Sequence, residues 1–264
     1  MPDTELHIEG EHAAITGAAR GIGREIADAL LAAGVNVAVN DVSQDALDEV
    51  AQDLGDRDGD LLTHQDDAAD PDAMEGLIED AVAAFGGLDI LVNNVGIAGP
   101  TKPIEEITHE EFFATLEVNL GGLFDATRAA VPHLEASDAG RVVNLSSMSG
   151  KRPLPDRTPY TTAKMGVIGF TRTLATELAE DGITANAVCP GSVAGPRVDR
   201  VIEGQAKSQD RPIAEVKEEF RAVSPMKEFT QPEDVADAVL YLCSDRAAHV
   251  TGEDLNVSAG VVMY

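Results

Sequence analysis

The chain has 264 residues, 44% of them hydrophobic, which is enough to bury a core and excludes a disordered chain. No apolar run reaches the ~18–20 residues of a membrane-spanning helix, and the acidic first residues lack the basic and apolar regions of a secretory signal. With 19 basic against 47 acidic residues and a net charge of −28, the chain should repel nucleic acid and acidic membranes.

Short apolar segments typical of β-strands alternate with helical patterns along the chain. Strands are predicted at 13–16, 35–40, 88–93, 141–145 and 183–188, and the helical patterns between them include 23–33 and 164–180. Strands that are apolar throughout are buried on both faces, and helices in the connections supply the cover. We therefore predict one α/β domain over 1–264, a doubly wound, Rossmann-type parallel sheet with helices on both faces.

Three helix starts are marked by capping signals. Asp70 is followed by Pro71, a cap residue with proline at the first helical position. Thr108 is followed by Glu111 at the spacing of a capping box, and Thr230 by Glu233 at the same spacing. We expect a helix to begin after each of these caps.

The first strand runs into a glycine-rich turn that opens a helix. Gly17, Gly21 and Gly23 let the backbone turn tightly and approach a pyrophosphate, which the helix N-terminus would bind. Asp41 ends the next strand, where a carboxylate accepts hydrogen bonds from a ribose diol and repels a 2′-phosphate. NAD is therefore favoured over NADP, although Arg20 within the turn could pair with a 2′-phosphate.

The segment 195–224 interrupts the alternation of strands and helices. It is polar, contains glycines and prolines, and has weak helical periodicity. Because it follows the last predicted strand, we interpret it as a substrate-binding lid. The alternative is a solvated surface insertion.

Tyr160 and Lys164 lie four residues apart, on one face of the predicted helix. A phenol has a pKa of about 10 and is a poor base at neutral pH, but a nearby ammonium stabilises the phenolate. Ser147 follows the strand 141–145, where a hydroxyl could hold the oxygen of a reacting alcohol or carbonyl. Taken alone, a Tyr–Lys pair at this spacing is more often a surface contact.

Four further motifs give this pair its context. They are Asp67-Ala68-Ala69-Asp70, Asn93-Asn94-Val95-Gly96, Val118-Asn119-Leu120 and Pro190-Gly191. With the glycine turn and the serine, tyrosine and lysine above, they resemble the short-chain dehydrogenase/reductase family in its single-domain form. The resemblance covers nearly the whole chain, and the order of the motifs is the same.

The resemblance implies a role for each matching position. It implies a catalytic set of Asn119, Ser147, Tyr160 and Lys164, in which the tyrosine exchanges a proton with the substrate oxygen and the asparagine links a proton relay to solvent. The cofactor-binding positions it implies are Gly17, Arg20, Gly21, Ile22, Gly23, Asp41, Asp67, Ala68, Asn94, Gly96, Tyr160, Lys164, Pro190, Gly191 and Val193. Gly195 departs from the family pattern, which often has threonine there.

Basic residues are scarce, yet several lie close to the predicted catalytic positions. Lys151, Arg152 and Arg157 stand between Ser147 and the tyrosine, and Arg197 opens the predicted lid. A guanidinium matches a carboxylate in a two-pronged hydrogen bond, so we expect an anionic or strongly polar substrate such as a sugar acid. The alternative is that these side chains pair with carboxylates of this chain or of a neighbouring subunit.

The sequence thus favours an oxidoreductase that transfers a hydride between NAD and a secondary alcohol or ketone, namely a sugar, a sugar acid or another polar hydroxylated substrate. A 3-oxoacyl-thioester reductase and a catalytically inactive NAD-binding regulator are the alternatives. The histidines form no metal-ligand cluster with the cysteines, so no metal is expected.

The setting of the enzyme is also predicted. Cys189 and Cys243 lie far apart in the sequence, which indicates reduced thiols of a cytoplasmic protein rather than a disulfide scaffold. The high negative charge favours a salt-adapted, halophilic protein over an ordinary acidic enzyme. The resemblance implies a homotetramer built from helices near 108–134 and 160–180, and the apolar tail 261–264 would be buried at a subunit contact or within the monomer.

Overall fold

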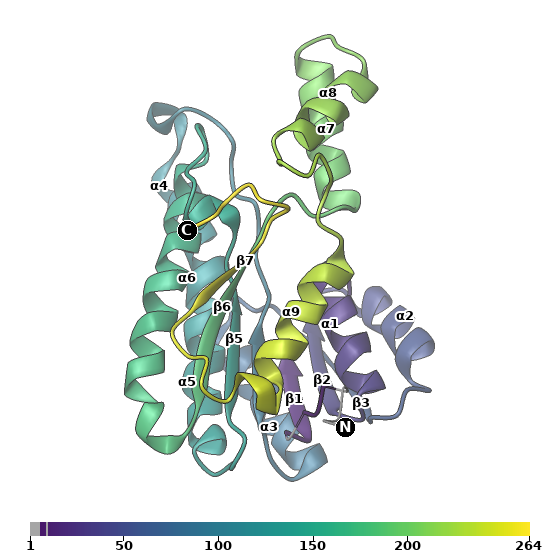
Figure 1. Cartoon of the computed structure of the whole chain (residues 1–264), viewed down its shortest axis with the longest axis vertical. Helices are drawn as coiled ribbons and strands as arrows, with labels where there is room; N and C mark the ends of the chain where they lie inside the picture. The colour runs from purple at the N-terminus through teal and green to yellow at the C-terminus, as the bar shows by residue number, and fades with distance from the viewer. Residues whose placement is uncertain (1–5, 9) are drawn as a thin grey trace.

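A computed structural model describes residues 6–8 and 10–264 (Figure 1). Its strands form one sheet in the order β3-β2-β1-β4-β5-β6-β7, and every pairing is parallel. The strands are β1 (His12–Ile15), β2 (Asn36–Asp41), β3 (Leu61–Gln65), β4 (Ile90–Asn93), β5 (Arg141–Leu145), β6 (Thr184–Pro190) and β7 (Asp254–Val257). The predicted doubly wound parallel sheet is confirmed.

Helices connect successive strands. The α-helices are α1 (Gly21–Ala32), α2 (Gln44–Leu54), α3 (Pro71–Phe85), α4 (His109–Leu116), α5 (Gly122–Leu134), α6 (Thr158–Glu177), α7 (Pro196–Ser208), α8 (Ile213–Ala222) and α9 (Pro232–Cys243). A π-helical turn, η2 (Glu117–Gly121), joins α4 to α5. Short 3-10 turns are η1 (Ile104–Glu106), η3 (Met148–Gly150), η4 (Ala179–Asp181) and η5 (Asp245–Ala247).

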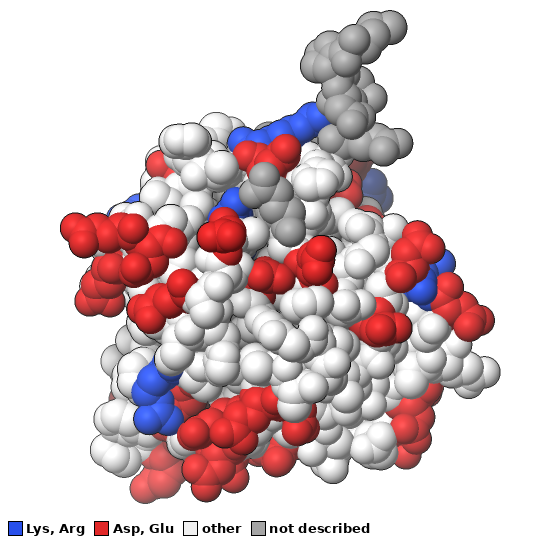
Figure 2. Space-filling model, turned by 90° about the horizontal axis from the view of Figure 1, so that it is seen from below, with Lys and Arg blue, Asp and Glu red and all other residues white. Residues whose placement is uncertain are grey.

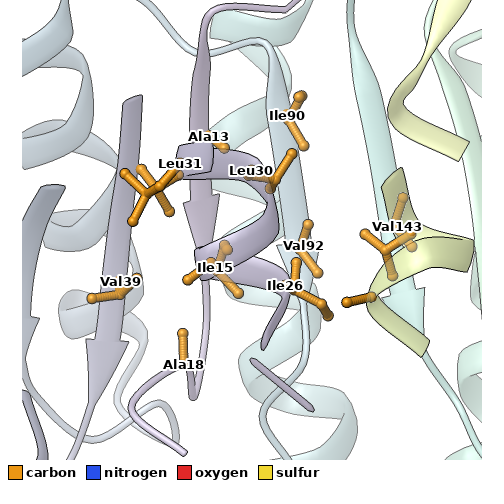
Figure 3. Close-up of a cluster of buried hydrophobic side chains, with 14 of the residues drawn as sticks. Ala13, Ile15, Ala18, Ile26, Leu30, Leu31, Val39, Ile90, Val92 and Val143 are labelled. Carbon is orange, nitrogen blue, oxygen red and sulfur yellow. The ribbon is translucent and has the colours of Figure 1, made fainter. Parts of the chain in front are cut away.

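Alternation along the strands divides the core between the two faces of the sheet. Ile15 faces α1, α2 and α9, where it belongs to the same buried cluster as Ile26 (Figure 3). Its neighbour Ala14 faces the opposite layer and packs with residues of α3, α5 and α6, such as Met74. Full burial of an isoleucine stabilises the fold by about 1.5–3 kcal/mol, so these two layers hold the strand ends in fixed register.

Two of the three predicted helix caps are confirmed. Asp70 accepts a hydrogen bond from the Asp72 N–H at 3.0 Å, ahead of Pro71 at the first position of α3. Thr108 Oγ1 accepts from the Glu111 N–H at 3.2 Å, and the Glu111 carboxylate accepts in return at 2.8 Å.

The third predicted cap, at Thr230 with Glu233, is wrong by one residue. The capping box of α9 consists of Gln231 and Asp234, because Pro232 fixes the first helical position. Thr230 instead forms an isolated bridge with Val193 and donates a hydrogen bond to the Val257 carbonyl oxygen at 3.3 Å.

The segment 195–224, in which the sequence shows only weak helical periodicity, contains the helices α7 and α8. Figure 1 shows this pair standing at the end of the sheet where β6 leads into it, beyond the other helices. The two helices share a small buried cluster of their own, formed by Ile202, Ala206 and Val216. A pair of helices that share one small cluster needs few apolar side chains. This explains why the helical periodicity of the segment 195–224 is weak in the sequence.

The remaining expectations concern the cysteines, the tail and the surface. Cys189 and Cys243 are both buried and free. In the tail, Val262 is buried while Met263 and Tyr264 are exposed. Carboxylates spread over the face seen in Figure 2, with few basic side chains between them. Within the described ranges, no helix is both long and apolar enough to cross a membrane.

Candidate active site

The sheet order reverses between β1 and β4, and the loops after these two strands meet at that point. Gly17 has a φ of +64°, and a Cβ there would lie 2.7 Å from Val95 Cγ2, so only glycine fits. Gly21 has a φ of +56° and open space around it. The turn therefore approaches the β4 loop on one side and leaves room for a ligand on the other.

Asn94 fixes the distance between these loops. Its Nδ2 donates to the carbonyl oxygens of Thr16 at 3.1 Å and Gly17 at 2.7 Å. Thr16 Oγ1 accepts from the N–H groups of Asn94 and Val95 at 3.1 and 3.2 Å. A Cβ on Gly23 would lie 2.5 Å from Asn94 Nδ2, so this glycine makes room for the contact.

The N-terminus of α1 suits the pyrophosphate of a dinucleotide. Its cap residue Arg20 makes no side-chain capping hydrogen bond, and the first turn, which contains Ile22, carries no acidic residue. The free N–H groups and the positive end of the helix dipole are therefore available to an anion. The helices α2, α3 and α4, by contrast, have side-chain caps.

Groups suited to an adenosine moiety lie beside this turn. Asp41, at the end of β2, accepts a hydrogen bond from the Ser43 N–H at 3.1 Å. Arg20 Nη2 lies 3.4 Å from Ser43 Oγ, so the cation and the carboxylate predicted to decide between NADP and NAD share one neighbour. Asp67 Oδ1 accepts from the Ala69 N–H at 3.0 Å, and the adjacent Ala68 is buried.

The other end of the candidate cofactor site is formed by the loop after β6. The Gly191 N–H donates to the Val257 carbonyl oxygen at 2.8 Å, and a Cβ at Gly191 would lie 2.8 Å from Ser258 Cα. The loop between Pro190 and Val193 is thereby held against the chain that follows β7. Together with the turn and the adenosine end, it completes a cradle that fits a nicotinamide dinucleotide.

Ser147, Tyr160 and Lys164 lie together where β5 leads toward α6, and all three are buried. Ser147 Oγ forms a hydrogen bond with the tyrosine side chain. Lys164 Nζ lies 6.0 Å from the centre of the Tyr160 ring and donates to the Leu145 carbonyl oxygen at 2.8 Å. The helix begins at Thr158 rather than near the lysine, so its first two turns carry both groups.

The environment acidifies the phenol. Burial alone would raise the pKa of Tyr160, but the charges of Lys164 and Arg197, the hydrogen bond with Ser147 and the charge of Arg157 together hold it below its ordinary value. Burial also lowers the pKa of the Lys164 ammonium. A phenol with a lowered pKa is suited to exchange a proton near neutral pH.

Asn119 lies in the π-helical turn η2 and borders the lysine. Its Nδ2 donates to the carbonyl oxygens of Ile97 at 3.1 Å and Thr115 at 2.8 Å. Among the described residues its buried Oδ1 has no partner. A Cβ on Gly96 would lie 2.6 Å from this oxygen and 3.1 Å from Lys164 Nζ, so both groups border one small space. An unpaired acceptor beside an ammonium suits a proton relay.

Two of the three arginines predicted for the substrate flank the tyrosine. The guanidinium carbon of Arg157 lies 4.7 Å from the Tyr160 ring centre, and that of Arg197 lies 5.7 Å from it. Arg157 also donates to Thr101 Oγ1 at 3.0 Å. Arg152 is exposed and is not among the cations placed near the ring.

Lys151 differs from the arginines. It was expected to add to the positive charge near the reaction centre, but its Nζ pairs with Asp254 Oδ2 at 2.6 Å. Here the alternative of pairing with a carboxylate of the same chain holds. No local sequence pattern indicates this pair, because the two residues are 103 positions apart.

Sequence reasoning also missed two serines. Ser43 contacts both Asp41 and Arg20, and its position just before a helix is a capping signal that could have drawn attention to it. Ser146 Oγ donates to the Lys164 carbonyl oxygen at 2.7 Å and ties the serine loop to α6.

No group of metal-binding side chains occurs in the described part of the chain.

Sequence comparison finds the chain similar to known reductases and dehydrogenases. A family model described as Enoyl-(Acyl carrier protein) reductase matches residues 17–262. The 3-oxoacyl-acyl-carrier-protein reductase of Staphylococcus aureus is 35% identical over 252 residues, covering 95% of this chain and 98% of that protein. The D-beta-hydroxybutyrate dehydrogenase of Rhizobium meliloti is 37% identical over 256 residues, covering 94% and 97%.

Solved structures share the whole architecture. L-sorbose reductase from Gluconobacter frateurii, complexed with NADPH and L-sorbose, has a TM-score of 0.93 at 28% identity and covers 99% of this chain and 100% of that one. An NAD+-bound xylitol dehydrogenase has a TM-score of 0.89 at 27% identity and covers 94% and 97%. The cofactors of both structures are nicotinamide dinucleotides, the class of ligand that the cradle described above suits.

Proposed function

The chain belongs to the short-chain dehydrogenase/reductase family of NAD(P)-dependent enzymes that act on CH–OH groups, and from that premise we propose that it oxidises or reduces a polar substrate that carries an anionic group. The proposal is supported by the two arginines at the Tyr160 ring. The substrate would be a hydroxy acid, with a sugar acid among the candidates.

The catalytic residues divide the proton chemistry between them. Ser147 Oγ orients the substrate oxygen, and Tyr160 Oη accepts the hydroxyl proton during oxidation or returns it during reduction. Lys164 stabilises the phenolate, and Asn119 passes the proton toward solvent. When bound, the nicotinamide cofactor supplies or accepts the hydride.

The arginines favour a carboxylate over a neutral sugar. Neither Arg157 nor Arg197 forms an ion pair with a carboxylate in the described part of the chain, which leaves both cations for a ligand. Burial lowers the pKa of the Arg157 guanidinium, and a bound anion would relieve that cost. A relative whose name gives D-beta-hydroxybutyrate as its substrate acts on a hydroxy acid.

The anionic-substrate proposal is tested by following the absorbance of reduced nicotinamide with matched pairs of alcohols at high salt. D-beta-hydroxybutyrate and gluconate form the anionic arm, and 2-butanol and xylitol form the neutral arm. We expect turnover in the anionic arm with a lower KM, and no turnover for the Tyr160→Phe variant. Equal kcat/KM in both arms would contradict the role of the arginines.

A second candidate is a 3-oxoacyl-thioester reductase. It is favoured by the family description and by the relatives of that name. The net charge of −28 disfavours it, because an acyl carrier protein is itself acidic and would be repelled. Acetoacetyl-CoA with reduced cofactor tests this candidate directly. An inactive NAD-binding regulator is disfavoured by the complete set of buried catalytic side chains.

We propose NAD as the preferred cofactor. The proposal is supported by Asp41 at the end of β2, whose carboxylate would accept hydrogen bonds from a ribose diol and repel a 2′-phosphate. Asp41→Ala should raise the kcat/KM ratio of NADP to NAD, since a repelling carboxylate is removed. A wild-type preference for NADP would contradict this assignment.

We also propose that 195–224 is the substrate lid. Arg197, at its first turn, already reaches the tyrosine ring, and the helices α7 and α8 share a cluster of their own. Gly195, with a φ of +133° and open space around it, can serve as a hinge. The proposal predicts that substrate binding protects α7 and α8 from hydrogen exchange.

Two further proposals concern the subunit assembly and the salt content of the protein's surroundings. The apolar groove between α4, α5 and α6 supports a homotetramer; its lining residues include Phe113, Leu116, Leu120, Phe124 and Phe170. The acidic surface supports salt adaptation in the cytoplasm (Figure 2). A thermal midpoint that stays constant from low to high salt would contradict the latter.

A further inference from the structure

Three charged side chains from three elements meet at the start of β7. Lys151 follows the turn η3, Arg172 lies on α6, and Asp254 is the first residue of β7. Lys151 Nζ lies 2.6 Å from Asp254 Oδ2, and Arg172 Nη2 lies 2.7 Å from Asp254 Oδ1. The lysine also donates to the Asp254 carbonyl oxygen at 2.8 Å. Each carboxylate oxygen therefore has a cation of its own.

This cluster differs from the surface ion pairs of the protein. The side chains of Lys151 and Asp254 are only 8% and 12% exposed, whereas Arg172 is 61% exposed. Burial would raise the pKa of the Asp254 carboxyl, but hydrogen bonds from both cations hold it below its usual range. A buried pair gains little net stability because desolvation offsets its attraction. Its clearer effect is to fix the geometry of the parts that it joins.

One of the joined parts is the turn that carries the catalytic serine. Ser147 caps η3, and its Oγ accepts from the Ser149 N–H at 3.1 Å. Lys151 ends the same turn, with its N–H donating to the Met148 carbonyl oxygen at 3.0 Å. A displacement of Lys151 would therefore move the turn at whose other end the serine hydroxyl is held.

The other joined part is the helix of the tyrosine and lysine. Ser146 Oγ donates to the Lys164 carbonyl oxygen at 2.7 Å, and a Cβ on Gly150 would lie 2.8 Å from that same oxygen. The serine turn thus packs directly on α6 at Lys164. Arg172 lies two helical turns further along α6. Asp254 consequently bridges the two elements whose spacing sets the distance between the serine and the phenol.

We propose that Asp254 is a positioning residue of the active site, which holds the serine turn and the catalytic helix in register through Lys151 and Arg172. The proposal rests on the catalytic roles proposed above for Ser147 and Tyr160. It assigns Lys151 to the support of the catalytic serine rather than to substrate binding.

The test compares three variants of the full chain. Asp254→Asn leaves Lys151 without its charge partner, and Asp254→Glu keeps the charge. The double variant Lys151→Met/Asp254→Leu replaces the buried pair by apolar groups and leaves the net charge unchanged. If the pair served only the stability of the fold, this replacement would preserve what the pair does. Asp28→Asn is the matched control, because Asp28 pairs with Arg57 on a different part of the surface.

Three readouts are measured for every variant: the thermal midpoint, kcat and KM with the best alcohol of the panel above, and the ultraviolet titration of Tyr160. The Tyr160→Phe protein is the baseline for that titration, which requires no substrate. The titration therefore tests the positioning role even if no alcohol is turned over. A lack of turnover would count against the proposed function alone.

We expect the apolar double variant to melt near the wild type, yet to lose between about tenfold and about 100-fold in kcat. Its Tyr160 should ionise at higher pH, because the hydrogen bond with Ser147 is weakened. Asp254→Glu should recover part of both, and Asp28→Asn should match the wild type. A double variant with a wild-type titration of Tyr160 would overturn the proposal, whatever its stability.

Discussion

Replacing Arg157 by glutamine removes a charge beside the catalytic phenol and keeps a donor for Thr101. The guanidinium carbon lies 4.7 Å from the Tyr160 ring centre. At an effective permittivity of about 20, a unit charge at that distance stabilises the phenolate by about 3.5 kcal/mol. The side chain is half-buried, so screening by water reduces this to roughly 1–2 kcal/mol, about a tenfold change in phenolate population.

The assay is the pH dependence of kcat for alcohol oxidation. Oxidation needs the phenolate, so the rate rises with pH and levels off above the pKa of Tyr160. Loss of the Arg157 charge raises that pKa, because a charge that favours the phenolate is gone. The rising limb should therefore move to higher pH. At a fixed pH on the limb kcat should be about tenfold lower, and on the plateau it should return to the wild-type value.

A matched variant separates this effect from a general change of charge. Arg200→Gln alters an exposed arginine of α7 that is not among the charges acting on the tyrosine. It should leave the limb where the wild type has it. An unmoved limb in Arg157→Gln, or an equal movement in both variants, would refute the electrostatic reasoning.

Three other substitutions test neighbouring parts of the account. Gly17→Ala places a methyl group 2.7 Å from Val95 Cγ2 at a φ of +64°, so it should destabilise the fold by roughly 1–3 kcal/mol and weaken NAD binding in calorimetry. Gly96→Ala crowds Asn119 Oδ1 at 2.6 Å and should lower kcat more than it raises the Kd for NAD. Phe124→Glu should shift the sedimentation of the protein toward smaller species, since Phe124 is 50% exposed in the apolar groove.

The interior of the fold was the part most accessible from the sequence. The predicted strands became β1, β2, β4, β5 and β6, with boundaries that shift by up to two residues, because a strand buried on both faces is apolar throughout. The strands not predicted, β3 and β7, are the two edges of the sheet. An edge strand keeps polar residues such as His64 and Asp254, so its apolar signal is weak.

In the candidate site, the contacts between residues close in the sequence could be predicted, and the contacts between distant residues could not. Tyr160 and Lys164 could be placed together because one helix carries both, and Gly17 because a tight turn requires it. The pairing of Lys151 with Asp254 could not, since it depends on how β7 joins the sheet. The cap predicted at Thr230 was wrong because Pro232 fixes the first helical position, and the threonine hydroxyl bonds to Val257 at the end of β7 instead.

The central claim is that Tyr160 exchanges the proton of the reacting alcohol. Its most direct measurement is Tyr160→Phe, assayed for turnover and for NAD binding on the same preparation. We predict that turnover is lost and that the Kd for NAD stays close to the wild-type value, since the ring remains and only the hydroxyl is removed. A phenylalanine variant that still turns over the substrate at the wild-type rate would contradict the account.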